Sequence, residues 1–247
     1  MFNYNLYETH LYTKQFGRHL KYFQSISSTN EQAKAYINDF KHGYTIITKN
    51  QVNGRGRQDN VWYSIPNKSL TFSVIINHNK LNNKKLLSII SCLAIIKAIK
   101  EYTNIDCKVK WPNDIMLNQK KLGGILIEKI NDFLILGIGI NVNESFEDLN
   151  INIKKISTSL HIFNSKIFEL EILFANILNK LEDHFNSKKN NPISEWNEYC
   201  CHINKEITFH DNNKIKSGIF KGINNNGEAI IDINNKINYI STGVINL

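Results

Sequence analysis

Arginine is scarce in this sequence. Of the 30 lysine and arginine residues among 247, only three are arginine, at positions 18, 55 and 57. Two of the three therefore stand almost side by side, each after a glycine, in the segment GRGRQDNVWYS (54–64). Because a guanidinium can grip two oxygens of one anion and an ammonium cannot, this concentration indicates a specific task for the pair.

Other absences exclude whole classes of protein. The four cysteines form no C-x-x-C pair, so neither a zinc site nor a disulfide framework is indicated, and reduced thiols are expected. The longest apolar run, FLILGIGI (133–140), is far shorter than the roughly 18 residues of a membrane span. Residues 1–20 show no secretory signal pattern. We therefore expect a cytoplasmic protein without a membrane partner.

The formal net charge of +8 at pH 7 raises the question of a nucleic-acid partner. The lysines are scattered along the chain, and asparagine and isoleucine are abundant too, so a general compositional bias explains the charge better. A basic nucleic-acid-binding module stays open as an alternative. Clustered basic stripes would favour it.

Length and periodicity predict a globular chain with two parts. With 42% hydrophobic residues, 247 residues fit one large domain, or a medium domain and a small one. Apolar spacing predicts helices at 29–39, 82–102, 166–185 and 191–200, strands at 44–48, 69–76 and 107–111, and a hairpin over 124–143. From about residue 203 short strands alternate with Asn, Gly and Asp turns, which predicts a small β-barrel. We divide the chain into a catalytic domain (1–202) and this barrel (203–247).

The glycine–arginine segment has the properties of an anion-binding loop. Glycine lets backbone N–H groups come close to a ligand, and the two arginines add positive charge around it. The segment follows the strand predicted at 44–48. Trp62 supplies a flat wall on which a ring can stack. The alternative is a surface loop in which the glycines only turn the chain. The uneven use of arginine favours the functional interpretation.

A second motif is KVKWPNDIMLNQKKLGGILIE (108–128). Pro112 favours an extended residue before it, and Asn113–Asp114 favours a turn. A strand end, a turn and a hairpin would explain this topology, but not the lysine pair ahead of the double glycine. Lys121 at that point can direct an ammonium at a reacting oxyanion.

Five motifs in one order resemble the biotin–protein ligases: SSTN (27–30), Q-x-x-GRGR…W-x-S (51–64), KWPNDI (110–115), KLGGILIE (121–128) and GIGINVN (137–143). The resemblance is clear over residues 18–143 and weaker toward the C-terminus. It implies an α+β fold related to class II aminoacyl-tRNA synthetases and lipoate ligases, in which a mixed β-sheet packs with helices and a small C-terminal β-barrel follows.

The resemblance also implies a reaction. Biotin and ATP, with Mg²⁺, would form biotinyl-5′-AMP, and the biotinyl group would pass to a lysine of a biotin carboxyl carrier protein, expected to be an acyl-CoA carboxylase subunit. Too few residues precede Ser28 for a helix-turn-helix domain, so we expect a ligase that does not bind DNA. A lipoate–protein ligase is the nearest alternative, although its aliphatic ligand gives no reason for SSTN with Gln51.

By resemblance, each motif residue receives a role. Arg55 and Lys121 are assigned as catalytic, at the carboxylate and α-phosphate. Biotin binding is assigned to Ser28, Thr29, Asn30, Gln51, Gly54, Arg55, Gly56, Arg57, Lys121 and Gly124. The nucleotide or adenylate is assigned to Arg57, Trp62, Asn113, Asp114 and Asn141, and no metal ligands are assigned.

Two questions remain after the resemblance. The common bacterial loop has a further glycine and arginine where this chain has Asp59 and Asn60, so we expect weaker ordering of the loop over the intermediate. The chain is expected to be a monomer or a homodimer. The hairpin at 124–143 is a candidate for a free sheet edge that pairs with the carrier or another subunit.

Overall fold

The computed structural model describes residues 2–37, 42–81, 84–187, 191–211 and 214–246. Its centre is a seven-stranded sheet in the order β1 (Leu20–Phe23), β2 (Thr45–Thr48), β5 (Ser69–Asn77), β9 (Phe133–Asn141), β8 (Lys120–Ile130), β7 (Asp114–Leu117) and β6 (Lys108–Lys110). Only β1 and β2 pair in parallel; the other neighbours are antiparallel. The sheet is therefore mixed, as the resemblance implied.

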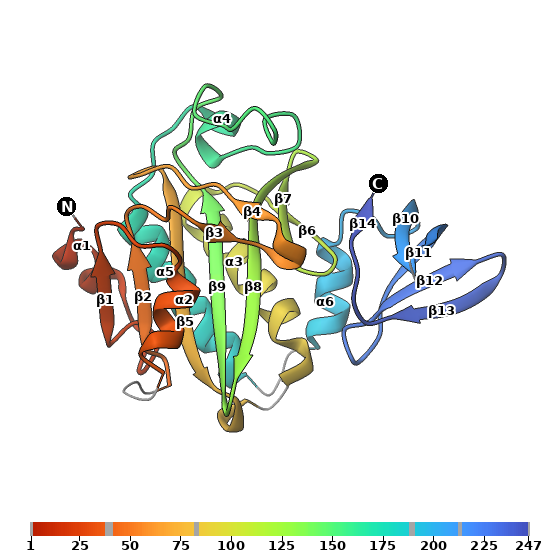
Figure 1. Ribbon diagram of the computed structural model, residues 1–247, viewed down its shortest axis with the longest axis horizontal. Helices are drawn as coiled ribbons and strands as arrows, with labels where there is room; N and C mark the ends of the chain where they lie inside the picture. Colours follow the sequence, from red (N-terminus) through yellow and green to blue (C-terminus); the bar gives the residue numbers. More distant parts are fainter. Residues whose placement is uncertain (1, 38–41, 82–83, 188–190, 212–213, 247) are drawn as a thin grey trace.

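Helices cover both faces of this sheet (Figure 1). One face packs on α1 (Tyr4–His10), α3 (Leu87–Thr103) and α5 (Leu170–Asn186), which share the large core. The short helix α2 (Thr29–Ala35) covers part of the other face, with a small core of its own. Two further helices are α4 (Leu160–Asn164) and α6 (Pro192–Tyr199). No helix among the described residues has both the length and the apolarity needed to cross a membrane.

Residue alternation along two central strands separates the core from the site. Along β5 and β9, alternate residues such as Phe72 and Ile138 join the large core. On the other face, Ile75 and Ile135 belong to the small core at α2, but the positions next to them are small or polar. The register there places Ser69, Thr71 and Ser73 opposite Asn141, Gly139 and Gly137. These six positions carry no large apolar side chain, so the sequence itself leaves room for a cavity over them.

The predicted elements are largely confirmed. The helix predicted at 29–39 ends at Ala35, and its last two residues lie outside the described part. The helix predicted from 82 begins as α3 at Leu87, after a 3₁₀ turn (Lys84–Leu86), and residues 82–83 are not described. In α6 the Asn191 side chain accepts from the backbone N–H of Ile193 and Ser194, as a capping residue does.

Two features differ from the sequence analysis. The hairpin at 124–143 forms β8 and β9, which lie in the interior of the sheet, so it offers no free edge; β1 and β6 hold the edges. Hairpin pattern alone cannot show this, because β5 and β7 pair with it from elsewhere in the chain. The sequence analysis also missed α1 and β1, which are short elements with little periodicity.

The C-terminal part forms an antiparallel sheet. Its order is β13 (Lys236–Ile240), β12 (Ala229–Ile233), β11 (Lys214–Ile223), β10 (Glu206–Asp211) and β14 (Ile245–Asn246). It lies beside α6 (Figure 1), and buried side chains such as Phe220 and Ile231 join the large core. Hydrogen bonds also connect it to the rest of the chain. Asn197 of α6 accepts from the backbone N–H of Ile223 (3.1 Å), and Trp111 Nε1 donates to the carbonyl of Gly227 (3.0 Å). The division at residue 202 remains a prediction.

Glu144, just after β9, is a buried carboxyl group with an unusual environment. It accepts a hydrogen bond from the Ser69 hydroxyl, while its Oε2 has no partner among the described residues. Burial raises the pKa of Glu144 to about 7, and the hydrogen bond from Ser69 offsets only part of that effect. An unfolded glutamate titrates near pH ~4.3. Between these values the folded chain therefore holds a proton that the unfolded chain has lost.

Stability should consequently fall as pH rises from about 4.3 to about 7, and stay lower above that. Glu144→Gln removes the titrating group. We expect the free energy of unfolding of the variant, relative to the unaltered protein, to improve by up to about 3 kcal/mol between pH 5 and pH 8. Urea denaturation at the two pH values measures this, and parallel pH dependences for the two proteins would contradict it.

Candidate active site

A cavity of about 560 Å³ lies on the small and polar face of the large sheet. Over it lies a two-stranded ribbon, β3 (Gly54–Arg55) and β4 (Val61–Trp62), joined through the 3₁₀ turn η1 (Arg57–Asp59). Of the residues predicted from sequence, those that line the cavity are Ser28, Thr29, Asn30, Gln51, Arg55, Gly56, Arg57, Trp62, Asn113, Asp114, Lys121 and Gly124. These residues come from four of the five motifs, and the fifth, GIGINVN, lines the same space through Gly137 and Gly139.

Two glycines of β9 form the floor of this cavity. A Cβ at Gly137 would lie 2.3 Å from Asn30 Oδ1, and a Cβ at Gly139 would lie 2.4 Å from the Trp62 ring. Real Cβ atoms do not come this close to other atoms, so any larger residue at either position would force Asn30 or Trp62 to move. The motif GIG therefore lets Asn30 and the Trp62 indole lie flat against the strand.

Gly139→Ala tests whether this placement of the indole matters. The added methyl group must displace Trp62, while alanine suits a strand at least as well as glycine. We expect the affinity for biotin, the ligand that the resemblance implies, to fall about tenfold, or by about 1.4 kcal/mol. The melting temperature should change little. Isothermal titration together with thermal melting measures both quantities. Unchanged affinity would show that the position of Trp62 does not contribute to binding.

A polar corner is built from α2 and Gln51. Gln51 Oε1 accepts from the backbone N–H (2.8 Å) and the hydroxyl (3.2 Å) of Thr29. Its Nε2 has no partner among the described contacts, and Ser28, at the start of α2, makes no capping bond with its side chain. The Gln51 amide N–H groups and the Ser28 hydroxyl therefore remain available to a ligand.

Asn30 is occupied by the protein itself. Its Nδ2 donates to Glu128 Oε2 (2.7 Å) and approaches the Leu126 carbonyl (3.5 Å), and its Oδ1 accepts from the Ser73 hydroxyl (2.6 Å). Little of its hydrogen-bonding capacity is left for a ligand. We therefore regard Asn30 as a residue that positions α2 on the sheet.

Two buried polar atoms at the cavity have no hydrogen-bond partner among the described residues. They are Trp62 Nε1 and Thr71 Oγ1, and Thr71 lies directly opposite Gly139 in the sheet register. An unpaired buried donor or acceptor costs roughly 1–3 kcal/mol, so a ligand that pairs with both would recover this. Sequence analysis did not select Thr71, although the alternation of Ser69, Thr71 and Ser73 along the strand was a usable signal.

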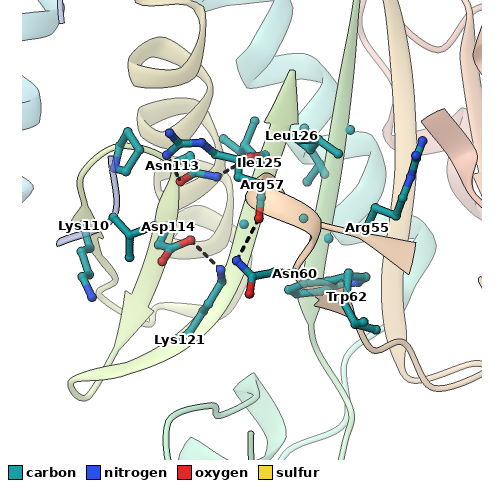
Figure 2. Close-up of a pocket in the computed structure, with 18 of the residues that line it drawn as sticks. Arg55, Arg57, Asn60, Trp62, Lys110, Asn113, Asp114, Lys121, Ile125 and Leu126 are labelled. Atoms are coloured by element: carbon teal, nitrogen blue, oxygen red, sulfur yellow. Dashed lines mark hydrogen bonds and ion pairs between the residues drawn. The ribbon is translucent and has the colours of Figure 1, made fainter. Parts of the chain in front are cut away.

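Two cations reach the neighbouring residues Asn113 and Asp114 at the cavity (Figure 2). Lys121 Nζ pairs with Asp114 Oδ1 at 2.6 Å, and Arg57 Nη1 donates to Asn113 Oδ1 at 3.4 Å. Asn113 is held in turn by the backbone carbonyl of Ile125, which accepts from its Nδ2 at 2.6 Å. Burial lowers the pKa of Arg57, and the charge of Asp114 acts against this. A guanidinium remains charged in any case, so Arg57 is a partly desolvated cation.

The turn that carries Arg57 is closed by Asn60. The backbone N–H of Gly56 donates to the Asn60 carbonyl (2.6 Å), and both the backbone N–H and the side-chain amide of Asn60 donate to the Arg57 carbonyl (3.2 and 2.8 Å). The sequence analysis treated Asn60 only as a departure from the common loop. In the structure its side chain ties the loop together beside the cavity.

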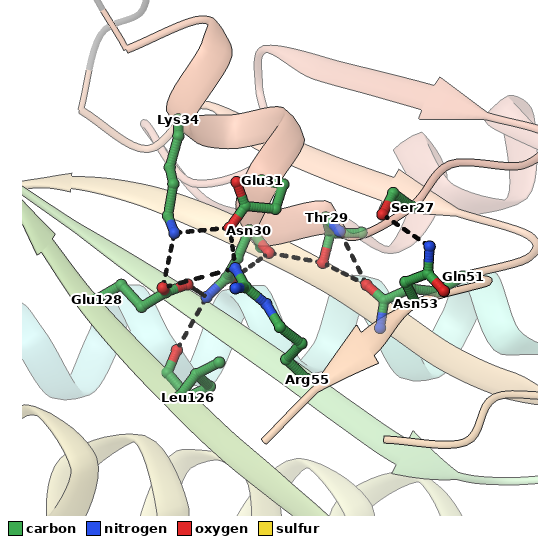
Figure 3. A network of polar contacts seen from close by, with 11 residues as sticks. Ser27, Thr29, Asn30, Glu31, Lys34, Gln51, Asn53, Arg55, Leu126 and Glu128 are labelled. Carbon is green, nitrogen blue, oxygen red and sulfur yellow. Dashed lines mark hydrogen bonds and ion pairs between the residues drawn. The ribbon is translucent and has the colours of Figure 1, made fainter. Parts of the chain in front are cut away.

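Arg55 points in another direction from Arg57. Its guanidinium contacts Glu31 on α2, and Nη2 lies 3.9 Å from Glu128 Oε1 on β8 (Figure 3). The residue borders the cavity, but its charge is engaged by these two carboxylates. The sequence analysis assigned Arg55 to the reacting groups, and this assignment stays a prediction.

Two predicted residues are not among the lining residues that the structure describes. Asn141 is buried and donates through Nδ2 to the Thr158 carbonyl at 2.9 Å. At Gly54 a Cβ would lie 2.3 Å from the Trp62 carbonyl oxygen and 2.6 Å from Gln51 Nε2. Both residues hold the frame of the site.

The sequence analysis also missed part of the cavity wall. Lys110, Gln119, Lys155, Ile156 and the segment Gly243, Val244 and Ile245 line the cavity. The last three belong to the C-terminal part and carry no local signal of their position. In the described ranges, no group of three or more His, Cys, Asp or Glu side chains is arranged to hold a metal ion.

Two family models match this chain. The first, described as the biotin/lipoate A/B protein ligase family, matches residues 22–144, which carry the large sheet and the loop. The second, described as the biotin protein ligase C terminal domain, matches residues 202–247.

Individual proteins agree with these models. The bifunctional ligase/repressor BirA of Bacillus subtilis is 29% identical over 96% of this chain and 76% of its own length. The biotin–[acetyl-CoA-carboxylase] ligase of Mycobacterium tuberculosis is 28% identical over 44% of this chain and 42% of its own length. The structure of the biotin protein ligase of Aquifex aeolicus with biotin and ATP aligns with a TM-score of 0.84, 26% identity, and coverage of 93% of this chain and 98% of that one. This chain belongs to the biotin protein ligase family.

Proposed function

We propose that this protein activates biotin with ATP and transfers it to a lysine of a carrier protein. In the first step a biotin carboxylate oxygen bonds to the α-phosphorus of ATP, and the bond to pyrophosphate breaks. In the second, the lysine amine bonds to the acyl carbon, AMP leaves, and the amine loses a proton. The observation that carries this proposal is one cavity with a neutral polar corner and, apart from it, two inward-facing cations, Arg57 and Lys121.

Charge is the main obstacle to the first step, because a carboxylate must approach a polyphosphate. Arg57 and Lys121 can offset the repulsion where it is greatest, near the reacting atoms. Lys121 holds its ammonium beside Asp114, which fixes its direction. Arg57 offers a fork of donors suited to phosphate oxygens.

The neutral end of the ligand needs different contacts. A ureido ring presents N–H donors and a carbonyl acceptor, which the Ser28 hydroxyl and the Gln51 amide can meet. A purely aliphatic ring system would leave these groups unpaired, which favours biotin over lipoate. Trp62 lies over Gly139 and can shield the reactive acyl phosphate from water.

Two finer parts of the proposal concern magnesium and the acceptor. Asp114 and the Asn113 amide oxygen are the hard donors at the cationic wall, and this sparse set fits a magnesium ion that arrives on the triphosphate. Such an ion would neutralise phosphate charge. For the acceptor we propose a biotin carboxyl carrier protein of an acyl-CoA carboxylase, which agrees with the name of the Mycobacterium tuberculosis relative.

The deciding experiment is exchange of labelled pyrophosphate into ATP, with and without biotin. We expect exchange only with biotin, and none with lipoate in its place. Transfer is followed by mass spectrometry of an added carrier domain. Exchange that proceeds with lipoate, or no exchange with either acid, would overturn the proposal.

A further inference from the structure

Four charged side chains form a compact cluster beside the loop, here called the clamp: Glu31, Lys34, Arg55 and Glu128. Lys34 Nζ lies 2.7 Å from both Glu31 Oε1 and Glu128 Oε1, and Arg55 completes the cluster from the other side (Figure 3). Two cations thus face two carboxylates. The four residues come from α2, β3 and β8, so the clamp ties the loop to both a helix and the sheet.

We propose that Arg55 is a positioning residue, anchored by Glu31 and Glu128, which holds the β3–β4 ribbon in place over the cavity. This rests on the proposed function above. Arg55 then does not act on the substrates directly. It fixes the first strand of the ribbon, and the ribbon carries the two groups that do face the ligand, Trp62 and Arg57.

The balance of charges in the clamp indicates that Arg55 stays bound to Glu31 and Glu128 and does not leave them for a ligand. If Arg55 left for a ligand, Glu31 and Glu128 would share Lys34 alone, and two carboxylates would face one ammonium. Burial alone would raise the pKa of Glu128, but hydrogen bonds from Lys34 and Asn30 and the charges of Lys34 and Arg55 outweigh it and lower the pKa. Glu128 is therefore held as an anion that needs its cationic partners.

The β3–β4 ribbon connects the anchored Arg55 with the cavity. Gly54 pairs with Trp62, and Arg55 pairs with Val61, so fixing Arg55 fixes the strand that carries the indole. Trp62 in turn lies against Gly139 on the floor. Arg57 follows on the far side of Gly56 and reaches Asn113.

The clamp is also joined to the polar corner. Glu128 accepts from Asn30, and Asn30 accepts from the Ser73 hydroxyl, whose oxygen lies 2.7 Å from the Thr29 hydroxyl. The backbone N–H of Thr29 in turn donates to Gln51 Oε1. One continuous set of hydrogen bonds thus connects the anchored loop with the groups that we assign to the ureido ring. This also explains the pair of arginines in the sequence: one faces outward to hold the loop, and the other faces inward to the ligand.

The test measures how fast biotinyl-AMP escapes from the protein when no acceptor is present, in Arg55→Gln, Glu31→Gln and the double variant. If Arg55 is an anchor, each single change should speed the escape of biotinyl-AMP at least about threefold. This effect lies in the upper part of the range found for exposed ion pairs. The double variant should escape no faster than the faster single one, because both changes remove the same contact. In Glu31→Gln, which changes no residue of the cavity wall described, the rate of adenylation at saturating substrates should stay within about twofold. Arg55→Lys, which keeps the charge, should recover part of the retention.

Three outcomes would overturn the proposal. Slower escape in Glu31→Gln would mean that the carboxylate withholds Arg55 from the ligand. Additive effects would mean that the two side chains act separately, and a loss of adenylation without faster escape in Arg55→Gln would make Arg55 catalytic. Asp106→Asn is the matched control, since it removes one carboxylate of the surface pair Lys100–Asp106 and should leave escape unchanged.

A second readout separates this proposal from the proposed function. Amide hydrogen exchange over residues 54–62 in the ligand-free protein should speed up at least about threefold in Arg55→Gln and Glu31→Gln, but not in Asp106→Asn. This result does not depend on which acid the protein activates. If the unaltered protein makes no biotinyl-AMP, the proposed function fails while the exchange data still test the anchor. Unchanged amide exchange in both variants would contradict the anchoring role of Arg55 and leave the proposed function untouched.

Discussion

Lys121→Ala is expected to slow biotin-dependent pyrophosphate exchange at least ~100-fold, the scale for removing a central electrostatic group. The Lys121 ammonium lines the cavity and is directed by Asp114 at 2.6 Å, so its loss leaves one cation fewer where carboxylate and phosphate meet. Initial rates at saturating and limiting ATP measure the loss. The decrease should appear in kcat, because the charge that Lys121 stabilises develops in the transition state.

Lys120→Ala is the matched control. This neighbour lies on the same strand and is not among the lining residues described, so its removal changes net charge equally without changing the cavity. Exchange should stay within about twofold of the unaltered protein. Equal losses in the two variants would show that general charge, rather than the ammonium of Lys121, promotes the reaction.

Arg57→Ala should produce a loss of similar size, about 100-fold or more. The guanidinium is half-buried and contacts Asn113, and a partly desolvated cation acts strongly on a phosphate. Arg57→Lys keeps the charge but loses the fork, so we expect an intermediate rate. Exchange assays with thermal melting of each variant distinguish this from unfolding. A lysine variant as slow as the alanine variant would show that fork geometry, and not charge, is what matters.

Sequence alone identified the fold and most residues around the cavity, for a physical reason. The long strands and helices repeat with periods of two and 3.6, so burial is encoded locally, as along β5 and α3. The glycine–arginine segment and the KWPND motif combine turn formers with charges, and both proved to line one space. Local chemistry was therefore sufficient to find the motifs.

The sequence did not predict in which direction each arginine side chain points, or which residues it contacts. Nothing in GRGR shows that Arg55 turns to Glu31 and Glu128 while Arg57 turns to Asn113, because those partners lie on other elements. The interior place of the 124–143 hairpin likewise depends on strands from elsewhere in the chain. Such contacts arise only from the tertiary fold.

The wall of the cavity joins Ser28, near one end of the described chain, to Ile245, near the other. Sites assembled from such distant segments form late, since the intervening chain must first be ordered. We therefore expect chemical competence to appear only with global folding. A half-folded molecule would then be unable to generate a mixed anhydride that acylates bystander amines.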